Sequence, residues 1–397
     1  MHPEHIISTI FLIFTGAAVL ATVALYARQT LLVAYIAIGL ILGQSGFNLI
    51  PDAGFLQQIS DIGIMFLLFL LGLNLNPKKL IHLLKSSTIL VVASSLLFAG
   101  FGYLIAVSFG FSSTESLVIA ASSIFSSTII GLKLLPTTVL HHRHTGEIII
   151  SILLLQDLIA IGLLMFLHTQ GQIGANDPSA QQHLLTLLIS FPTIILVAYL
   201  SEKYILQRLF LRFDTILEYV FLLAIAWCLG LAELATSMGL SHEIGAFIAG
   251  VAIASGPISQ FIAESLKPLR DFFLIIFFFT IGASFDISQL GNILIPAIIL
   301  AAFALSLKPI VFKKLLQLSG EDTTVATEVG FRVGQLSEFS ILLGALALQV
   351  GVIGQSASQL IQLATLLTFI VSANFHRLFI FDCISLPNTY RNIRSST

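Results

Sequence analysis

The chain has 397 residues, of which 57% are hydrophobic and 10% charged, and its formal net charge is -2. Charged residues are thus less than half as frequent as in soluble domains, which excludes a soluble enzyme. Apolar runs of about 20 residues recur along the chain and predict an all-α polytopic membrane protein. They are apolar on every face, which excludes the alternating strands of a membrane β-barrel.

Charged or Gly/Pro/Asn-rich breaks divide the apolar runs into thirteen predicted transmembrane helices. In chain order these cover residues 6–25, 30–43, 59–73, 86–109, 115–132, 145–168, 183–201, 217–235, 241–255, 268–285, 292–313, 325–350 and 357–377. We expect residues 1–397 to form a single transmembrane transporter domain. No C-terminal soluble nucleotide-binding domain is expected in this chain.

The basic residues set the predicted orientation. Sixteen of the 18 Lys and Arg residues fall in the odd-numbered loops, in the helix ends that adjoin them or in the C-terminal segment, and none falls in the even-numbered loops or the N-terminal segment. Basic residues collect on the cytoplasmic side of a membrane. The pattern therefore predicts a multi-pass protein of the bacterial cytoplasmic (inner) membrane, with its N-terminus outside and its C-terminus in the cytoplasm.

Two parts of the chain resemble each other weakly. Residues 61–80 align with residues 271–290 at an offset of 210, with Phe69 matching Phe279 and Gly72 matching Gly282. The offset pairs helix 3 with helix 10 and helix 5 with helix 12. Because paired helices are seven spans apart, an odd number, they cross the bilayer in opposite directions. We expect inverted repeats at approximately 30–168 and 241–377, an arrangement typical of secondary transporters.

Helices 5 and 12 are predicted to be interrupted. Helix 5 contains a hydroxyl-rich run over residues 122–128, and helix 12 contains two glycines and polar residues over 330–338. Hydroxyls can replace lost backbone hydrogen bonds, and glycine tolerates the backbone of an unwound turn. The alternative is that these small residues only allow tight helix packing.

Asp157 is the candidate for the transport site because it lies near the middle of helix 6. An ionised carboxylate there costs at least ~2.5 kcal/mol, so it should face water, hold a cation or be protonated. Such a group can exchange a proton for a metal ion. The alternative is a buried aspartate with a purely structural role. The adjacent Gln156 is expected to line the cavity edge or to contact a broken helix.

Three other charges lie inside predicted helices. Lys308 would pair with a transport-site carboxylate when no cation is bound, or else extend its ammonium to the cytoplasmic surface. Arg332 and Glu338 would compensate the dipole ends of two half-helices in helix 12.

Five motifs, in order along the chain, together resemble one transporter family. They are the segment 69–77 (FLLGLNLNP), the run 126–128 (SST), and the segments 155–161 (LQDLIAI), 245–250 (GAFIAG) and 334–339 (GQLSEF). The set resembles the monovalent cation:proton antiporter-2 family, and the Gln-Asp pair most resembles the transmembrane domain of its Kef-type potassium/proton antiporters.

The resemblance implies a homodimer with a mobile core that contains crossed discontinuous helices 5 and 12. It also implies that Asp157 binds the cation or proton with Gln156 as its partner. Lys308 matches the family's basic residue, and Gln335 and Glu338 match its Gln-x-x-Glu motif. One departure is Asn74, where the family usually has an acidic residue.

The resulting functional prediction is a monovalent cation:proton antiporter that contributes to pH homeostasis, with K+ favoured and Na+ also considered. Asp157 would hold the cation together with oxygens of the broken helices around Ser126, Ser127 and Thr128. No enzymatic activity, cofactor or nucleic-acid partner is expected. The expected partners are the transported ions, membrane lipid and a second copy of the chain, and a separate soluble regulatory subunit is also considered.

Two alternatives remain open at this point. In a ligand-gated potassium efflux channel, Asp157 would only concentrate cations. In a non-transporting membrane receptor or scaffold, Asp157 would be dispensable.

Overall fold

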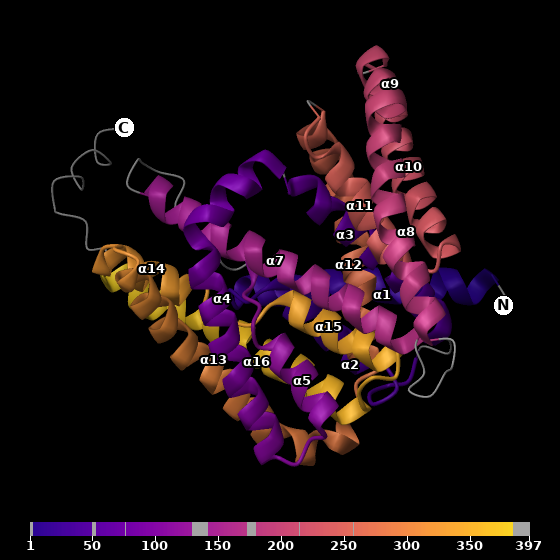
Figure 1. Ribbon diagram of the computed structural model, residues 1–397. Helices are drawn as coiled ribbons and strands as arrows, with labels where there is room; N and C mark the ends of the chain where they lie inside the picture. The colour runs from indigo at the N-terminus through magenta and orange to yellow at the C-terminus, as the bar shows by residue number, and fades with distance from the viewer. Residues whose placement is uncertain are drawn as a thin grey trace, which may run out of the picture.

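The computed structural model describes residues 3–49, 53–75, 77–128, 142–172, 180–213, 215–256 and 258–383. Regular structure in these ranges is helical throughout (Figure 1). The helices are α1 (Pro3–Tyr26), α2 (Leu31–Leu42), α3 (Ala53–Asn74), α4 (Pro77–Ser108), α5 (Ser113–Ser122), α7 (His142–Gln172), α8 (Ala180–Ser201), η1 (Glu202–Leu206), α9 (Gln207–Arg212), α10 (Leu217–Ser237), α11 (His242–Ile253), α12 (Ser259–Ala283), η2 (Ile287–Gln289), α13 (Leu290–Leu318), α14 (Thr323–Arg332), α15 (Glu338–Gln349) and α16 (Gln355–Cys383).

Membrane-spanning potential is clear from length and composition. Within the described residues, eight helices are long and apolar enough to cross a membrane, and α2, α11 and α15 are shorter apolar helices. Helical structure is present in all of the segments that the sequence predicts as spans. The total of thirteen spans stays a prediction.

Several predicted helix ends are wrong. Residues 202–212, predicted as a loop, continue the preceding helix as the π-helix η1 and the short helix α9. Helix α12 begins at Ser259 rather than at residue 268, so Lys267, predicted to precede the helix, lies within it. Long basic side chains keep their charge in water while their stems cover apolar surface. A helix boundary placed where hydropathy falls therefore leaves out the amphipathic turns that extend the helix.

The helices pack as two bundles. We call α1, α2, α3, α8, α10, α11 and α12 the panel bundle, and α4, α5, α7, α13, α14, α15 and α16 the core bundle, because helix contacts are concentrated within these two groups. In Figure 1, α8 to α11 stand at the upper right, whereas α4, α13 and α14 lie at the left. Among the described residues, few helix pairs from different bundles have closely approaching backbones, so side chains make most of the contact between the bundles.

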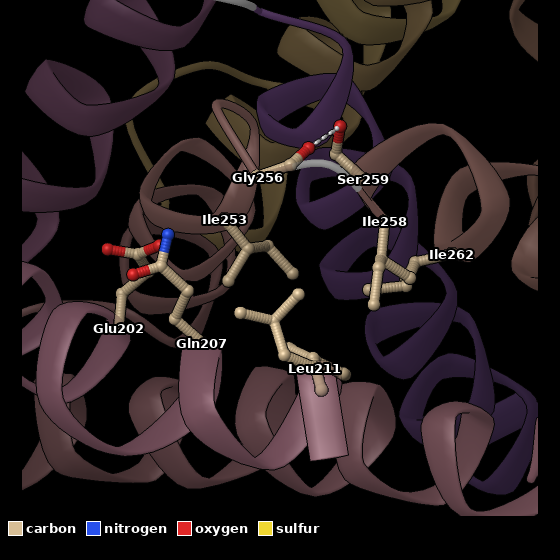
Figure 2. Close-up of a pocket in the computed structure, with 9 residues that line it drawn as sticks. Glu202, Gln207, Leu211, Ile253, Gly256, Ile258, Ser259 and Ile262 are labelled. Carbon is tan, nitrogen blue, oxygen red and sulfur yellow. Dashed lines mark hydrogen bonds between the residues drawn. The ribbon is translucent and has the colours of Figure 1, made fainter. Parts of the chain in front are cut away.

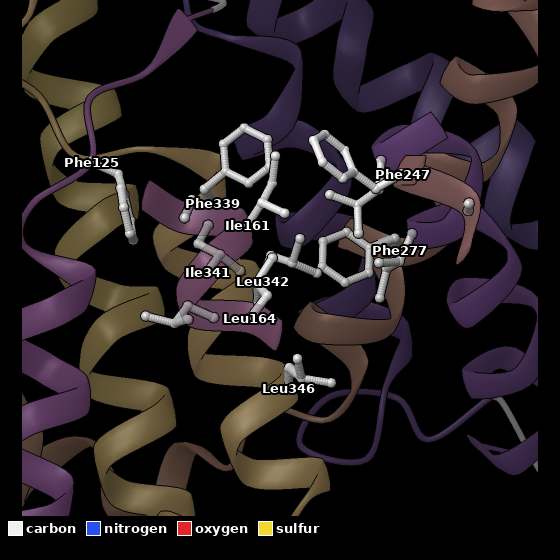
Figure 3. Close-up of a cluster of buried hydrophobic side chains, with 14 of the residues drawn as sticks. Phe125, Ile161, Leu164, Phe247, Phe277, Phe339, Ile341, Leu342 and Leu346 are labelled. Carbon is white, nitrogen blue, oxygen red and sulfur yellow. The ribbon is translucent and has the colours of Figure 1, made fainter. Parts of the chain in front are cut away.

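An apolar layer fills much of this interface (Figure 3). Ile161 of α7 and Leu342 of α15 belong to the core bundle, and they lie in one buried cluster with Phe247 of α11 and Phe277 of α12 from the panel bundle. Apolar contact of this kind is non-directional. The layer therefore excludes water without fixing one relative position of the bundles by hydrogen bonds.

Glycines allow two close helix crossings in the panel bundle. A Cβ atom on Gly39 of α2 would overlap the Phe279 carbonyl oxygen of α12, and one on Gly250 of α11 would overlap the Phe69 carbonyl oxygen of α3. Phe69 and Phe279 are matched residues in the 210-residue offset. The two crossings are thus built alike, as an internal repeat would produce. The repeat boundaries stay a prediction.

Gly250→Ala is expected to lower the free energy of unfolding by about 1–3 kcal/mol, because the added methyl group meets backbone that cannot rotate away. The measurement is a thermal unfolding curve in detergent. Gly230→Ala in α10 is the matched control, since nothing lies within 4 Å of its added Cβ atom. Equal stability of the two variants would contradict the close crossing.

Candidate functional site

Both predicted helix interruptions are confirmed. Helix α5 ends at Ser122, residues 125–127 have no regular secondary structure, and helical backbone resumes at Thr128. Helix α14 ends at Arg332, and α15 begins at Glu338. Ser337 caps α15, because its hydroxyl accepts a hydrogen bond from Phe339 N at 3.2 Å. We call these interruptions the first break and the second break.

The two breaks lie against each other. The Ser340 hydroxyl, just after the second break, donates to the Ser122 carbonyl oxygen at 2.6 Å. Lys308 Nζ donates to the Phe125 carbonyl oxygen at 2.8 Å and contacts that of Gln335 at 3.4 Å. One ammonium group thus connects the carbonyls of both breaks.

Lys308 is fully buried, so its ammonium does not reach the membrane surface. In addition to its carbonyl contacts, Nζ lies 5.0 Å from the centre of the Phe98 ring. Carbonyl oxygens and an aromatic face both stabilise a cation that is shielded from water. The sequence placed Lys308 among the charge-compensating or core-stabilising residues but did not predict these contacts.

Packing around Pro309 brings Lys308 to the breaks. A Cβ atom on Gly334, within the second break, would lie 2.7 Å from Pro309 Cγ, and one on Gly330 would lie 2.6 Å from the Pro309 carbonyl oxygen. Only glycine at these positions lets α14 and the second break approach α13 so closely. The glycines that suggested an unwound helix therefore also provide a packing surface.

Gln156 bonds to the first break. Its Oε1 accepts a hydrogen bond from Ser126 N at 3.1 Å, and its Nε2 donates to the Ile124 carbonyl oxygen at 3.1 Å. Of the two positions considered for Gln156, the structure therefore has the contact with a broken helix. Its amide replaces backbone hydrogen bonds that the unwound turn has lost.

Gln156→Leu is expected to destabilise the protein, because it removes the acceptor of Ser126 N. It also removes the closer of two donors to the Ile124 carbonyl oxygen, since Gln156 Nε2 lies at 3.1 Å and Lys308 Nζ at 3.4 Å. Each buried group left unpaired costs about 1–3 kcal/mol. Thermal unfolding measures the loss, with Gln317→Leu as a control because Gln317 makes only an exposed side-chain hydrogen bond. If both variants unfold alike, the amide of Gln156 does not support the break.

Asp157 is 3% exposed and lies in the middle of α7. The Glu338 carboxyl and the Thr128 hydroxyl are both within electrostatic range of the Asp157 carboxyl. Thr128 Oγ1 has no hydrogen-bond partner of ordinary geometry. The first turn of α15 and the end of the first break are thus both adjacent to this carboxylate.

Uncommitted oxygens surround the breaks. Ser126 Oγ, Thr128 Oγ1 and Gln335 Oε1 are buried and lack hydrogen-bond partners. Ser127, which lies between Ser126 and Thr128, is fully buried and has an interaction of its own. Unpaired buried polar atoms are costly and call for an explanation such as a bound ion or water. Oxygen atoms of this kind are the ligands that alkali cations use.

Arg332 and Glu338 lie where helix dipoles favour their charges. Arg332 is in the last turn of α14, and Glu338 is in the first turn of α15. Arg332 is 1% exposed, and its Nη2 bonds Glu328 Oε1 at 2.7 Å. Glu328 was not among the predicted site residues, although the four-residue spacing of the pair is a recognisable signal.

Thr368 of α16 also supports the second break and was missed. Its hydroxyl accepts a hydrogen bond from Leu336 N at 3.2 Å and donates to the Thr365 carbonyl oxygen at 2.8 Å. The signal in the sequence was a hydroxyl-bearing residue within a predicted apolar helix.

Asn74, the departure from the resembled motif, is exposed at the C-terminal end of α3.

A small cavity separate from Asp157 lies between η1 and α9 on one side and the α11–α12 connection on the other (Figure 2). Its volume is about 20 Å³, and Figure 2 shows that Leu211, Ile253 and Ile262 surround it. Glu202 is the acidic residue in its wall. A cavity of this size holds about one water molecule.

Comparison with known proteins agrees with this geometry. A family model described as sodium/hydrogen exchanger, transmembrane, matches residues 10–376. The putative K(+) efflux antiporter KefB of Alkalimonas amylolytica is 30% identical over 86% of this chain and 51% of its own length. K(+) efflux antiporter 4 of Arabidopsis thaliana is 29% identical over 80% of this chain and 54% of its own. The chain thus spans about half the length of these two relatives.

Two further proteins are similar. The iron transporter MagA of Paramagnetospirillum magneticum is 25% identical over 87% of this chain and 79% of its own length. The solved structure of the sodium proton antiporter MjNhaP1 from Methanocaldococcus jannaschii superposes with a TM-score of 0.69, covering 96% of this chain and 98% of that one at 17% identity. At this identity the likeness concerns the fold, and it confirms the predicted antiporter fold class.

Proposed function

Because the chain belongs to the sodium/hydrogen exchanger family of cation:proton antiporters, we propose that it exchanges a monovalent cation for protons at Asp157. K+ is the preferred cation in this proposal, and Na+ is the alternative. The observation that carries it is the buried Asp157 carboxyl beside two helix breaks in which the side-chain oxygens of Ser126, Thr128 and Gln335 lack hydrogen-bond partners.

Competition for one carboxylate couples the two ions. A buried carboxylate can be neutralised by a proton or by a cation, and binding of one removes the charge that attracts the other. A dehydrated cation also needs further oxygen ligands, which Ser126, Thr128 and Gln335 can supply. Binding at Asp157 alone is therefore sufficient to make cation and proton movement mutually dependent.

Four other side chains position the site rather than bind the ion. Gln156 and Lys308 hold the backbone of the breaks, so the ligand oxygens stay in place without a cation. Arg332 and Glu338 compensate the helix ends that face each other across the second break. Glu338 also adds negative potential near Asp157, which favours a cation or a proton there.

Alternating access would arise from movement of the core bundle against the panel bundle. The site residues belong to core helices and breaks, so they can move as one body. The water-excluding apolar layer between the bundles would slide during this movement. We extend the proposal to inverted repeats at approximately 30–168 and 241–377, a homodimer, and an inner-membrane orientation with the N-terminus outside.

The preference for K+ rests on the adjacent Gln156 and Asp157 and on relatives named as K(+) efflux antiporters. A separate soluble regulatory subunit is part of the same proposal. MagA is named an iron transporter. An iron substrate is not favoured here, because no group of three or more His, Cys, Asp or Glu suited to a metal ion occurs among the described residues.

A proteoliposome assay tests this function. Purified protein is reconstituted with a pH-sensitive dye inside, and Li+, Na+, K+ or Rb+ is added outside. We expect K+ and Rb+ to change the internal pH most strongly. Cation flux without proton counter-flux would instead identify the channel, and absence of flux for every cation would favour the receptor or scaffold.

A further inference from the structure

A larger cavity, lined by Gln, Ser and Thr residues as well as apolar side chains, lies between the two bundles, away from the breaks. Its volume is about 260 Å³, which holds several water molecules. Helices α3 and α12 of the panel bundle form one wall, and α15 and α16 of the core bundle form the other. Its position at the start of α3 and α16 and the end of α12 and α15 places it toward the membrane face whose loops lack basic residues.

Buried amides in the cavity wall lack partners. Gln359 is 2% exposed, and neither its Oε1 nor its Nε2 has a hydrogen-bond partner. Gln362 is 7% exposed, with Nε2 bonded to Ser358 Oγ and Oε1 unpaired. Burying such groups is unfavourable unless something polar meets them. A polar molecule or ion in the cavity can supply the hydrogen-bond or ligand partner that these amides lack.

The charge beside the cavity selects for a cation. Gln57 of α3 and Gln349 of α15, both in the wall, donate to opposite oxygens of the Asp61 carboxyl at 3.1 and 3.5 Å. Glu243 and His242 also lie within electrostatic range of Asp61. The wall itself contains no Lys or Arg among the described residues. Negative potential therefore dominates this end of the interface.

A line of polar side chains leads from the cavity toward the second break. Gln362, Thr365 and Thr368 follow one another at three-residue spacing along α16. Thr368 bonds to Leu336 N within the second break. The rise of an α-helix makes the distance from Gln362 to Thr368 roughly 9 Å. An ion in the cavity is thus about two helical turns from the breaks.

We propose that this cavity is a second binding site, which holds a partly hydrated monovalent cation before it reaches Asp157. Its ligands are Gln359 Oε1, Gln362 Oε1 and the hydroxyls of Ser60 and Thr280, with waters completing the shell. Asp61 supplies charge without direct coordination. The site rests on the proposed function for the identity of its ion, but its occupancy does not require exchange at Asp157.

Rb+ binding in an Asp157→Asn background tests the second site separately from transport. The melting temperature in detergent is followed during titration with RbCl at constant ionic strength, with choline chloride as the balance. We expect a saturable Rb+-dependent rise to survive Asp157→Asn and to disappear when Gln359→Leu and Gln362→Leu are added. Gln44→Leu, at an exposed glutamine in the connection after α2, is the control that should leave the rise unchanged.

Loss of the Rb+ response in Asp157→Asn alone would overturn the second site, as would its persistence in the triple variant. Gln359→Glu provides a test that does not depend on folding of the leucine variants. The added carboxylate should lower the apparent Kd for Rb+ about tenfold, and an unchanged or higher Kd would also overturn the site. Exchange retained by Asp157→Asn would defeat the proposed function and leave these binding results unaffected.

Discussion

Asp157→Asn is expected to reduce cation-dependent proton movement in proteoliposomes to the level of protein-free vesicles. Asparagine has almost the same volume and can occupy the same place in α7. It cannot hold a proton or neutralise a cation, and the coupling described above needs one group that does both. The protein should still fold, because asparagine keeps the size of the side chain and can still hydrogen-bond to the Thr128 hydroxyl.

Two measurements accompany this variant. The melting temperature checks that folding is intact, and Asp286→Asn serves as a matched control because Asp286 is a solvent-facing cap before η2. The control should exchange at the wild-type rate. If Asp157→Asn also exchanges at that rate, the assignment of Asp157 as the ion site is wrong.

Lys308→Met is expected to produce the second large effect, a loss of stability together with a loss of exchange. Methionine fills similar space but donates no hydrogen bonds to the carbonyl oxygens of Ile124, Phe125 and Gln335, which the Lys308 ammonium now contacts. Each buried carbonyl left unpaired costs about 1–3 kcal/mol. The two breaks would therefore no longer be held together.

Thermal unfolding and the proteoliposome assay should both report this change. Lys314→Met, on the same helix but exposed, is the control and should change neither. If Lys308→Met keeps the wild-type melting temperature and loses only exchange, Lys308 acts as a charge partner of a transport-site carboxylate. That outcome would contradict the positioning role derived from its carbonyl contacts.

The sequence was sufficient to predict the features that follow from local chemistry. A hydroxyl run and a Gly-rich run predicted both breaks, because unwound backbone needs these residue types in either helix. The position of Asp157 in the middle of a long apolar run predicted a buried carboxylate. Both conclusions depend on the composition of one segment and not on its neighbours.

Contacts between distant segments could not be predicted in the same way. Lys308 is nearly 200 residues from the first break, and its contact with Phe125 exists only because the helices cross. The same is true of Thr368, whose role depends on the position of the second break. The start of α12 was misplaced for a different reason, since amphipathic turns extend this helix beyond its apolar run.

Proton release on cation binding tests the central claim most directly. RbCl and NaCl are added to purified protein in weakly buffered solution, and released protons are followed with a pH indicator over a range of starting pH. The account predicts release of about one proton per cation bound at Asp157 where that carboxyl starts protonated. It also predicts no release in Asp157→Asn, even where the second site still binds. Cation binding to the wild type without proton release, or equal release from Asp157→Asn, would contradict the account.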